Sequence, residues 1–252
     1  MKDILIHLRD YRDHTPAAVF GVQLAAFLGA SVTAVFACPH PMHFSPGPGS
    51  PLTTTFTQDA LELIKDAVQS RQAFKAWAGS LGAPQTDLVV VEGSASDALM
   101  QAAARHDLLV LDHPTDDRGP AWDIPGLILG TGLPCVVLPR EAILPSSRIQ
   151  RVAIAWNGSP EAMRAIHAAL PLLQGKQVLL LWGAEERNVS HRLEWDPPFH
   201  ISRYLQCHGV EAEERMIAAK HDDVGTILLD ASMKFGADLL VMGAYGRNRF
   251  SE

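Results

Sequence analysis

The stretch Asp238-Leu-Leu-Val-Met-Gly-Ala-Tyr-Gly-Arg-Asn-Arg-Phe-Ser-Glu252 decides how the rest of the sequence is interpreted. The run from Asp238 to Met242 is short and mostly apolar, a pattern typical of a buried parallel strand that opens into a loop. In an open α/β sheet such a loop lies at the carboxyl edge, where ligands bind. Gly243 and Gly246 lack side chains, so their backbone N–H groups could approach a phosphate closely. A tight turn after a buried strand also explains both glycines, and the sequence leaves these two interpretations open.

The composition restricts the class of protein. The chain has 252 residues, of which 47% are hydrophobic and 19% are charged, enough for a large core or for two domains. The formal net charge of -7 argues against nucleic-acid and anionic-membrane partners, because no basic stripe is present. No signal-peptide segment and no long apolar run occur, so we expect a soluble protein. Cys38, Cys135 and Cys207 are far apart and form no CxxC, which fits the reducing cytoplasm.

Hydrophobic periodicity predicts alternating strands and helices in the first half. We expect strands at residues 4–8, 32–37, 87–91, 107–111 and 135–138. We expect helices at residues 16–28, 57–81 and 96–105 and near Leu127, with a Pro/Gly-rich loop from Pro39 to Pro51. Thr15-Pro16 and Gly29 are typical of the start and the end of the first helix. Such an alternation requires a parallel sheet with helices on both faces.

The same pattern starts again after a linker at residues 139–147. Strands are expected at 152–156, 178–182, 212–217 and 238–242, and helices at 160–173, about 198–207 and 224–235. Residues 106–110 (HDLLV) and 237–241 (ADLLV) hold equivalent places, which indicates an internal repeat of about 130 residues. The predicted fold class is therefore α/β, with two tandem domains at residues 1–140 and 150–252. Each is an open parallel sheet of the five-stranded type, and the second lacks its last strand within this sequence.

These two repeats resemble a tandem universal stress protein of the UspA superfamily. The resemblance is carried by the two DLLV strands, by Asn157-Gly158-Ser159 after one first strand, and by Met242-Gly243-Ala244-Tyr245-Gly246-Arg247 after the last. It implies a Rossmann-like fold, related to the adenine nucleotide alpha hydrolases. It also implies that the second repeat binds ATP or a related adenine nucleotide, with no metal beyond nucleotide-bound Mg. ATP-binding members carry G-x2-G-x9-G-(S/T) after the fourth strand and an aspartate after the first.

The resemblance assigns roles to seven residues. Gly243 and Gly246 fall on the first glycine pair and would hold phosphates, and Asn157 falls on the acidic position beside the ribose. The base would be lined by the apolar residues Ala155, Leu181, Trp182 and Met242. Asn157 lacks the charge of the family's aspartate but can still donate and accept hydrogen bonds, so we expect weakened recognition. The second phosphate glycine would lie four positions beyond Glu252, which we interpret as a truncation rather than a loss.

The first repeat departs further from the family pattern. Asp112 stands in the place of Gly243, and Arg9 stands in the place of Asn157. A carboxylate would repel the anion that a glycine N–H attracts, so we expect no nucleotide there in the family manner. The residues that follow are expected to form a solvated loop, with a polar site as the alternative; they include His113, Asp116, Asp117 and Arg118.

Other polar residues suggest weaker candidates. Cys38, His40 and His43 carry metal-binding groups, but no fourth ligand is evident, and we predict no metal site. Surface or partly buried positions, rather than a catalytic set, are expected for the histidines of the second repeat, His191, His200 and His208. The exposed side of an alternating strand is expected for Glu211, Glu213 and Glu214. Ser159 is expected to cap a helix, since no G-x-S-x-G surrounds it.

Three functions remain open. The first is a stress-response module that binds an adenine nucleotide in the second repeat and acts as a sensor or regulator. The second is a universal stress protein without nucleotide, acting as a dimeric interaction scaffold, which Asp112 and Asn157 favour. The third is a slow ATP-hydrolysing or adenylating enzyme, for which no activated nucleophile or carboxylate pair is found. The resemblance also implies a homodimer, or an intramolecular pseudo-dimer of the two repeats.

Overall fold

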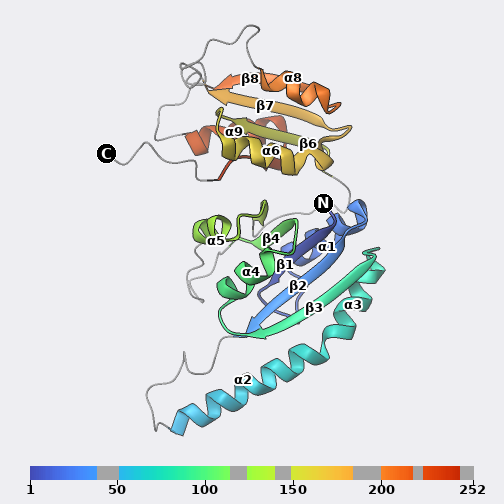
Figure 1. The fold of residues 1–252 in the computed structure, drawn as a ribbon, viewed down its shortest axis with the longest axis vertical. Helices are drawn as coiled ribbons and strands as arrows, with labels where there is room; N and C mark the ends of the chain where they lie inside the picture. The colour runs from blue at the N-terminus through green and yellow to red at the C-terminus, as the bar shows by residue number, and fades with distance from the viewer. Residues whose placement is uncertain (39–50, 114–123, 140–148, 184–199, 218–223, 245–252) are drawn as a thin grey trace, which may run out of the picture. The chain divides into compact units, whose positions relative to one another are not determined.

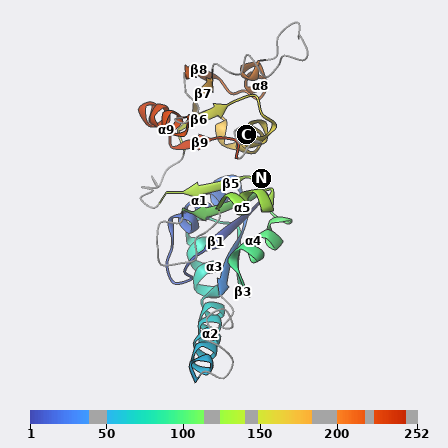
Figure 2. The same ribbon diagram turned by 90° about the vertical axis from the view of Figure 1, so that its left-hand side faces the viewer.

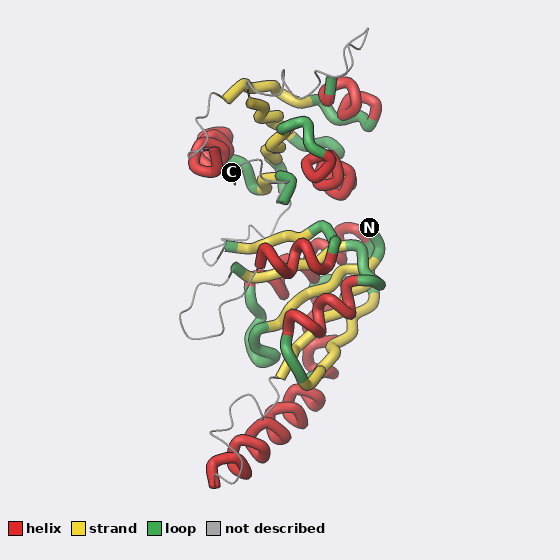
Figure 3. Tube along the Cα trace, turned by 60° about the vertical axis from the view of Figure 1, so that its left-hand side comes forward, coloured by secondary structure: helices red, strands yellow, loops and turns green. Residues whose placement is uncertain are grey.

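The computed structural model of the chain describes residues 1–38, 51–113, 124–139, 149–183, 200–217 and 224–244. The chain divides into two compact units, Met1–Leu144 and Pro145–Glu252 (Figure 1). Each unit contains one parallel sheet with helices on both of its faces, as expected (Figure 3).

The first unit has a five-stranded sheet in the order β3-β2-β1-β4-β5, in which every pair is parallel. Its strands are β1 (Asp3–Leu8), β2 (Ser31–Cys38), β3 (Gln85–Glu92), β4 (Leu108–Asp112) and β5 (Cys135–Leu138). Its helices are α1 (Pro16–Leu28), α2 (Pro51–Gln69), α3 (Arg71–Ser80), α4 (Ala95–Ala103) and α5 (Ile124–Thr131). Leu99 of α4 and Leu127 of α5 pack against Leu5 and Leu109 of the sheet. On the opposite face, Gly21 of α1 lies against Ile6, close enough that a Cβ there would be 2.5 Å from the Ile6 Cδ1.

One predicted helix, at residues 57–81, is wrong in its start and in its continuity. Helix α2 already begins at Pro51, within the stretch expected to be a loop, and α3 starts separately after Ser70. Proline suits the first turn of a helix because its missing N–H has no partner to satisfy there. At the junction the Ser70 Oγ donates to the Ala67 carbonyl at 2.7 Å, while the backbone hydrogen bonds from Ser70 N–H to Asp66 and from Phe74 N–H to Ser70 keep the helical spacing.

The second unit has a four-stranded parallel sheet in the order β8-β7-β6-β9. Its strands are β6 (Arg151–Trp156), β7 (Gln177–Gly183), β8 (Ala212–Ile217) and β9 (Leu239–Val241). Its helices are α6 (Pro160–Leu173), α8 (Ile201–Cys207) and α9 (Val224–Phe235). Figure 2 shows α8 and α9 on opposite sides of this sheet. Among the described residues there is no fifth strand beside β9.

Strand β8 does not alternate between buried and exposed residues as expected. Glu213, Glu214, Arg215 and Met216 are all exposed, because β8 is an edge strand with both faces partly open. Glu213 and Glu214 are consecutive and therefore project to opposite faces. Glu213 pairs with Arg215 at 2.8 Å, and Glu214 accepts a hydrogen bond from the Ser202 hydroxyl.

An aspartate ties the first strand of each unit to the fourth. The Asp107 carboxylate accepts hydrogen bonds from the N–H groups of Lys2 and Asp3, and the Lys2 hydrogen bond lowers the pKa of Asp107. Asp238 accepts in the same way from the N–H groups of Gln150 and Arg151, at 2.8 and 2.9 Å. The repeated DLLV motif thus has a structural reason, because its carboxylate joins two neighbouring strands at their starts.

Candidate functional site

The carboxyl ends of β6 and β9 meet where the strand order of the second sheet reverses. From β6 the chain continues outward through β7 and β8, and it returns to β9 on the other side of β6. In open α/β sheets this reversal point is where ligands bind. Two short segments follow the strands there, residues 157–159 after β6 and residues 242–244 after β9.

A tight turn leads from β6 into the first turn of α6. Gly158 has φ 74°, a left-handed conformation that favours glycine. The Asn157 Oδ1 accepts a hydrogen bond from the Ser159 N–H at 3.1 Å, and the Ser159 Oγ accepts one from the Ala162 N–H at 3.1 Å. Ser159 is therefore the N-cap of α6, as expected, and Pro160 follows as the first helical residue.

Gly243 brings the backbone after β9 against this same turn. A Cβ at Gly243 would lie 2.6 Å from the Ala162 nitrogen and 2.9 Å from the Glu161 carbonyl carbon. Real Cβ atoms do not come so close to a backbone, so the segment after β9 needs a glycine at this position. The helix N-terminus, the turn after β6 and the segment after β9 therefore meet at one place on the carboxyl edge.

The electrostatics of this place are mixed. The N-terminus of α6 carries the positive end of the helix dipole, which attracts anions. Glu161 adds a carboxylate in the same first turn, and it lies 3.7 Å from the guanidinium of Arg164. Asn157 contributes no charge. The site therefore offers backbone dipoles and an amide rather than a strongly cationic pocket.

The structure divides the predicted base-lining residues between the two faces of the sheet. Ala155 and Leu181 belong to the core on the face covered by α9, where Leu181 is fully buried. Trp182 projects to the other face by the alternation of β7, the face on which Leu180 packs. Met242 follows β9 and is 51% exposed. Gly246, the second of the two predicted phosphate-binding glycines, lies outside the described residues.

Sequence reasoning missed Trp156. Trp156 and Trp182 are partners in register on the neighbouring strands β6 and β7 and lie at their carboxyl ends. Both indole Nε1 atoms are buried and have no hydrogen-bond partner among the described residues. The signal was visible in the sequence, because each tryptophan ends the first or second strand of the second repeat. Buried polar groups are nearly always hydrogen-bonded, so the acceptors for these two donors are to be sought outside the described residues.

The corresponding edge of the first unit is built differently. Ile4 pairs with Leu108 as Val152 pairs with Leu239, so His7 stands in the place of Ala155 and Asp112 in that of Gly243. The Asp112 Oδ1 accepts a hydrogen bond from the Ala17 N–H in the first turn of α1. His7 is buried, and burial together with the charge of Arg9 lowers its pKa to about 3.

The remaining candidates do not assemble into a site in the described part of the chain. His113 donates its backbone N–H to the Leu138 carbonyl, whereas residues 116–118 lie outside the described ranges, as do His40, His43 and His191. Cys38 is buried at the end of β2. His200 and His208 flank α8 at its two ends. No group of three or more His, Cys, Asp or Glu suited to a metal ion occurs among the described residues.

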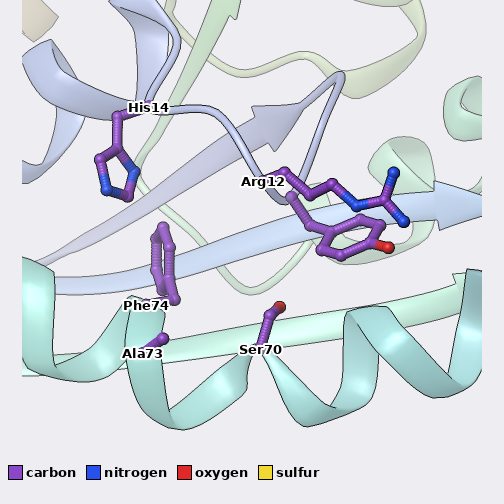
Figure 4. Close-up of a pocket in the computed structure, with 6 residues that line it drawn as sticks. Arg12, His14, Ser70, Ala73 and Phe74 are labelled. Atoms are coloured by element: carbon purple, nitrogen blue, oxygen red, sulfur yellow. The ribbon is translucent and has the colours of Figure 1, made fainter.

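A hollow of about 240 Å³ lies beside the loop after β1 in the first unit (Figure 4). It is lined by Tyr11, Arg12, His14, Ser70, Ala73 and Phe74. Two of its polar side chains have partners: the Arg12 guanidinium lies 5.0 Å from the Tyr11 ring centre and 3.6 Å from Asp66, and the His14 ring stacks on Trp77. The Tyr11 hydroxyl is buried and has no hydrogen-bond partner among the described residues. Figure 4 shows this guanidinium pointing away from His14. The hollow is smaller than most ligand pockets, and we assign it no ligand.

No helix in the described ranges has the length and apolar character needed to cross a membrane.

The sequence matches no protein-family model and no curated protein. Among solved structures, a universal stress protein from Archaeoglobus fulgidus DSM 4304 is 12% identical, with 94% of this chain and 83% of that chain covered and a TM-score of 0.60. The universal stress protein UspA from Lactobacillus plantarum is 17% identical, covers 55% of this chain and 97% of its own, and has a TM-score of 0.41. A universal stress protein in complex with cAMP is 14% identical, with 55% and 97% covered and a TM-score of 0.34. The first likeness confirms the expected fold over nearly the whole chain.

Proposed function

We propose that this chain, which has the fold of a universal stress protein, binds an adenine nucleotide in its second unit and acts as a stress-response sensor. The observation that carries the proposal is the approach of Gly243 to the first turn of α6 at the point where the strand order reverses. A helix N-terminus beside a bare backbone is suited to a phosphate group. The buried indole N–H groups of Trp156 and Trp182, at the ends of the neighbouring strands, could donate hydrogen bonds to the rest of the ligand.

Each residue of the site has a role in this proposal. Gly243 lets the segment after β9 approach the first turn of α6, whose N-terminus would face the phosphates, and Gly246 extends the same segment. Asn157 hydrogen-bonds a ribose hydroxyl through its amide. Trp182, together with Trp156, lies against the base, and Met242 covers it from the end of β9. Ala155 and Leu181 support this edge from the core side, because both pack beneath α9.

The test is calorimetric titration of the full chain with ATP, ADP and cAMP. We expect saturable binding with one nucleotide per chain. Asn157→Ala should weaken binding roughly five- to twentyfold, which corresponds to the loss of about one or two hydrogen bonds. Gly243→Asp should abolish binding, because it adds a negative charge and a side chain beside the Ala162 nitrogen.

Gly225→Asp is the matched control for this substitution. It places the same charge in the same unit, at a position where a Cβ meets nothing within 4 Å. Circular dichroism of each variant shows whether the unit stays folded. Nucleotide binding that is absent at millimolar concentration, or equal in Gly243→Asp and Gly225→Asp, would contradict the proposal.

An interaction scaffold is the second candidate, and one observation favours it. Helix α9 exposes Leu229 to 55% and Met233 to 71%, and an exposed apolar face is typical of protein contacts. In that case the chain pairs with a second copy, or its two units pair with each other. Light scattering of the wild type and of Leu229→Lys distinguishes these cases. A wild-type dimer that becomes a monomer in Leu229→Lys supports the scaffold. A monomer in both proteins excludes pairing with a second copy of the chain.

The cytoplasm is the compartment that we propose for either function. The three cysteines form no disulfide, and Cys207 is exposed. An exposed thiol persists where the surroundings are reducing.

A further inference from the structure

Helices α1 and α6 begin in the same way, and both face the carboxyl edge of their sheet. Thr15 caps α1 by accepting a hydrogen bond from the Ala18 N–H at 3.4 Å, and Ser159 caps α6 by accepting one from the Ala162 N–H at 3.1 Å. A proline follows each cap, so the first backbone donor of each helix is the residue after that proline. These donors are Ala17 in the first unit and Glu161 in the second.

The two helices differ in what the fourth strand brings to this donor. In the first unit the Asp112 Oδ1 accepts the hydrogen bond of the Ala17 N–H at 2.8 Å, although the two residues are 95 positions apart in the chain. With Thr15 on Ala18 and Asp112 on Ala17, both donors that follow Pro16 have a side-chain acceptor. The second Asp112 oxygen, Oδ2, is buried without a partner among the described residues, so the Ala17 contact is the one that holds this carboxylate.

In the second unit the same register position is Gly243, which has no side chain to offer. Its backbone lies so close to α6 that a Cβ would be 2.6 Å from the Ala162 nitrogen. A carboxylate such as that of Asp112 therefore cannot be carried at Gly243 without moving the segment after β9.

We propose that Asp112 is an internal anion of the first unit: its carboxylate occupies the N-terminus of α1, where a phosphate or sulfate would otherwise bind. A negative charge at a helix N-terminus is stabilising, and a tethered carboxylate outcompetes a free anion because its local concentration is high. The first unit is thereby stable without a ligand and closed to anions. Removing the Asp112 carboxylate opens an anion site there. The inference does not depend on nucleotide binding in the second unit.

Asp112→Ala in the full chain tests the inference by thermal unfolding and by hydrogen exchange of the Ala17 amide. We expect faster exchange at Ala17 and a fall of roughly 2–8 °C in the midpoint of the first unit, as for the loss of a helix cap. Inorganic phosphate at tens of millimolar should recover at least half of this fall, compared with sodium chloride at the same ionic strength. Wild-type protein should show no phosphate effect on the Ala17 amide.

Asp107→Ala is the matched control. Its carboxylate likewise accepts backbone hydrogen bonds in the first unit, from the N–H groups of Lys2 and Asp3, but it lies at the strand starts and not at a helix N-terminus. We expect Asp107→Ala to lower the midpoint without recovery by phosphate. Asp112→Asn keeps a hydrogen-bond acceptor at the same place. We expect this variant to retain the protection of the Ala17 amide and to show no phosphate effect. It replaces Asp112→Ala as the test variant if Asp112→Ala does not fold. Unchanged exchange at Ala17 in Asp112→Ala, lost protection in Asp112→Asn, or equal recovery of Asp112→Ala and Asp107→Ala by phosphate overturns the inference.

Discussion

His7 is a histidine buried in the core of the first unit, where its imidazole is removed from water. It is 5% exposed in the core of the first unit, and desolvation and Arg9 lower its pKa to about 3. In the unfolded chain a histidine titrates near 6.5. Between these two values the unfolded state binds a proton that the folded state does not, so stability decreases as the pH falls.

We therefore predict that the contribution of His7 to the free energy of unfolding does not change with pH above about pH 7. Below about pH 6.5 this contribution falls by about 1.4 kcal/mol for each pH unit. Urea unfolding at pH 7 and at pH 5 measures this difference, which should be about 2 kcal/mol.

His7→Leu should flatten this dependence, since it removes the titrating group and keeps the apolar volume. The control is His14→Gln, at an exposed position. An equal pH dependence in the wild type and in His7→Leu would show that His7 is not the group responsible.

The three cysteines differ in burial, and their reactivity should follow it. Burial raises the pKa of Cys135 to about 12, and burial and the charge of Glu92 raise the pKa of Cys38. Cys207 is exposed at the end of α8. Because the thiolate is the reactive form, we predict that iodoacetamide at pH 8 modifies Cys207 first in the native protein.

Mass spectrometry of the alkylated protein measures this order. In urea all three cysteines should react at similar rates, which serves as the control. Early modification of Cys135 in the native state would contradict the raised pKa of this thiol.

At the scale of elements, the aspartate that joins the first and fourth strands is the contact shared by both units. The Asp238 carboxylate accepts two backbone N–H groups at the start of β6. We predict that Asp238→Ala lowers the stability of the second unit by about 1–3 kcal/mol, because it leaves those two donors without their acceptor. Guanidinium unfolding of the full chain measures the change.

Asp230→Ala is the control for a lost carboxylate in the same unit. Asp230 pairs with Lys234 at 2.7 Å on the surface of α9, its one ion pair among the described residues, and such pairs contribute little. We expect a change below about 0.5 kcal/mol. A larger effect of Asp230→Ala than of Asp238→Ala would contradict the anchoring role of the strand aspartate.

Most elements were predictable from local sequence, and the two exceptions lie at a helix junction and at a sheet edge. Ser159 as a cap and Gly29 as a stop follow from side-chain chemistry within a few residues, and both are confirmed. The junction of α2 and α3 at Ser70 leaves no mark in the helical pattern of residues 57–81, because the backbone hydrogen bonds on both sides of Ser70 keep the helical spacing. The exposure of β8 depends on its place at the edge of the sheet, which the order of strands along the chain does not reveal.

At the scale of the whole molecule, each unit has a hydrophobic core of its own, as an independent domain does. The first unit has its own core around Leu5, Leu99 and Leu109, and the second has separate cores on the two faces of its sheet. We predict that residues 1–144 fold alone, because their sheet has all five strands and helices on both faces. Circular dichroism and a cooperative urea transition of this fragment measure the outcome.

The second unit serves as the comparison, because its sheet has four strands among the described residues and β9 at one edge. We expect residues 145–252 alone to be less stable than residues 1–144. A fragment 1–144 without a cooperative transition would show that the first unit depends on the second.

The sequence by itself determined the alternation of strands and helices, the repeat and the helix caps, because these depend on neighbours within a few positions. Only the tertiary structure decided that Asp112 reaches Ala17, that Gly243 lies against α6, and that Trp156 and Trp182 lie side by side. These contacts join segments far apart in the chain, and a shift of one residue in strand register would reverse the face of each side chain. Register arises from the packing of both faces of a sheet together, so it becomes visible only once the whole unit has folded.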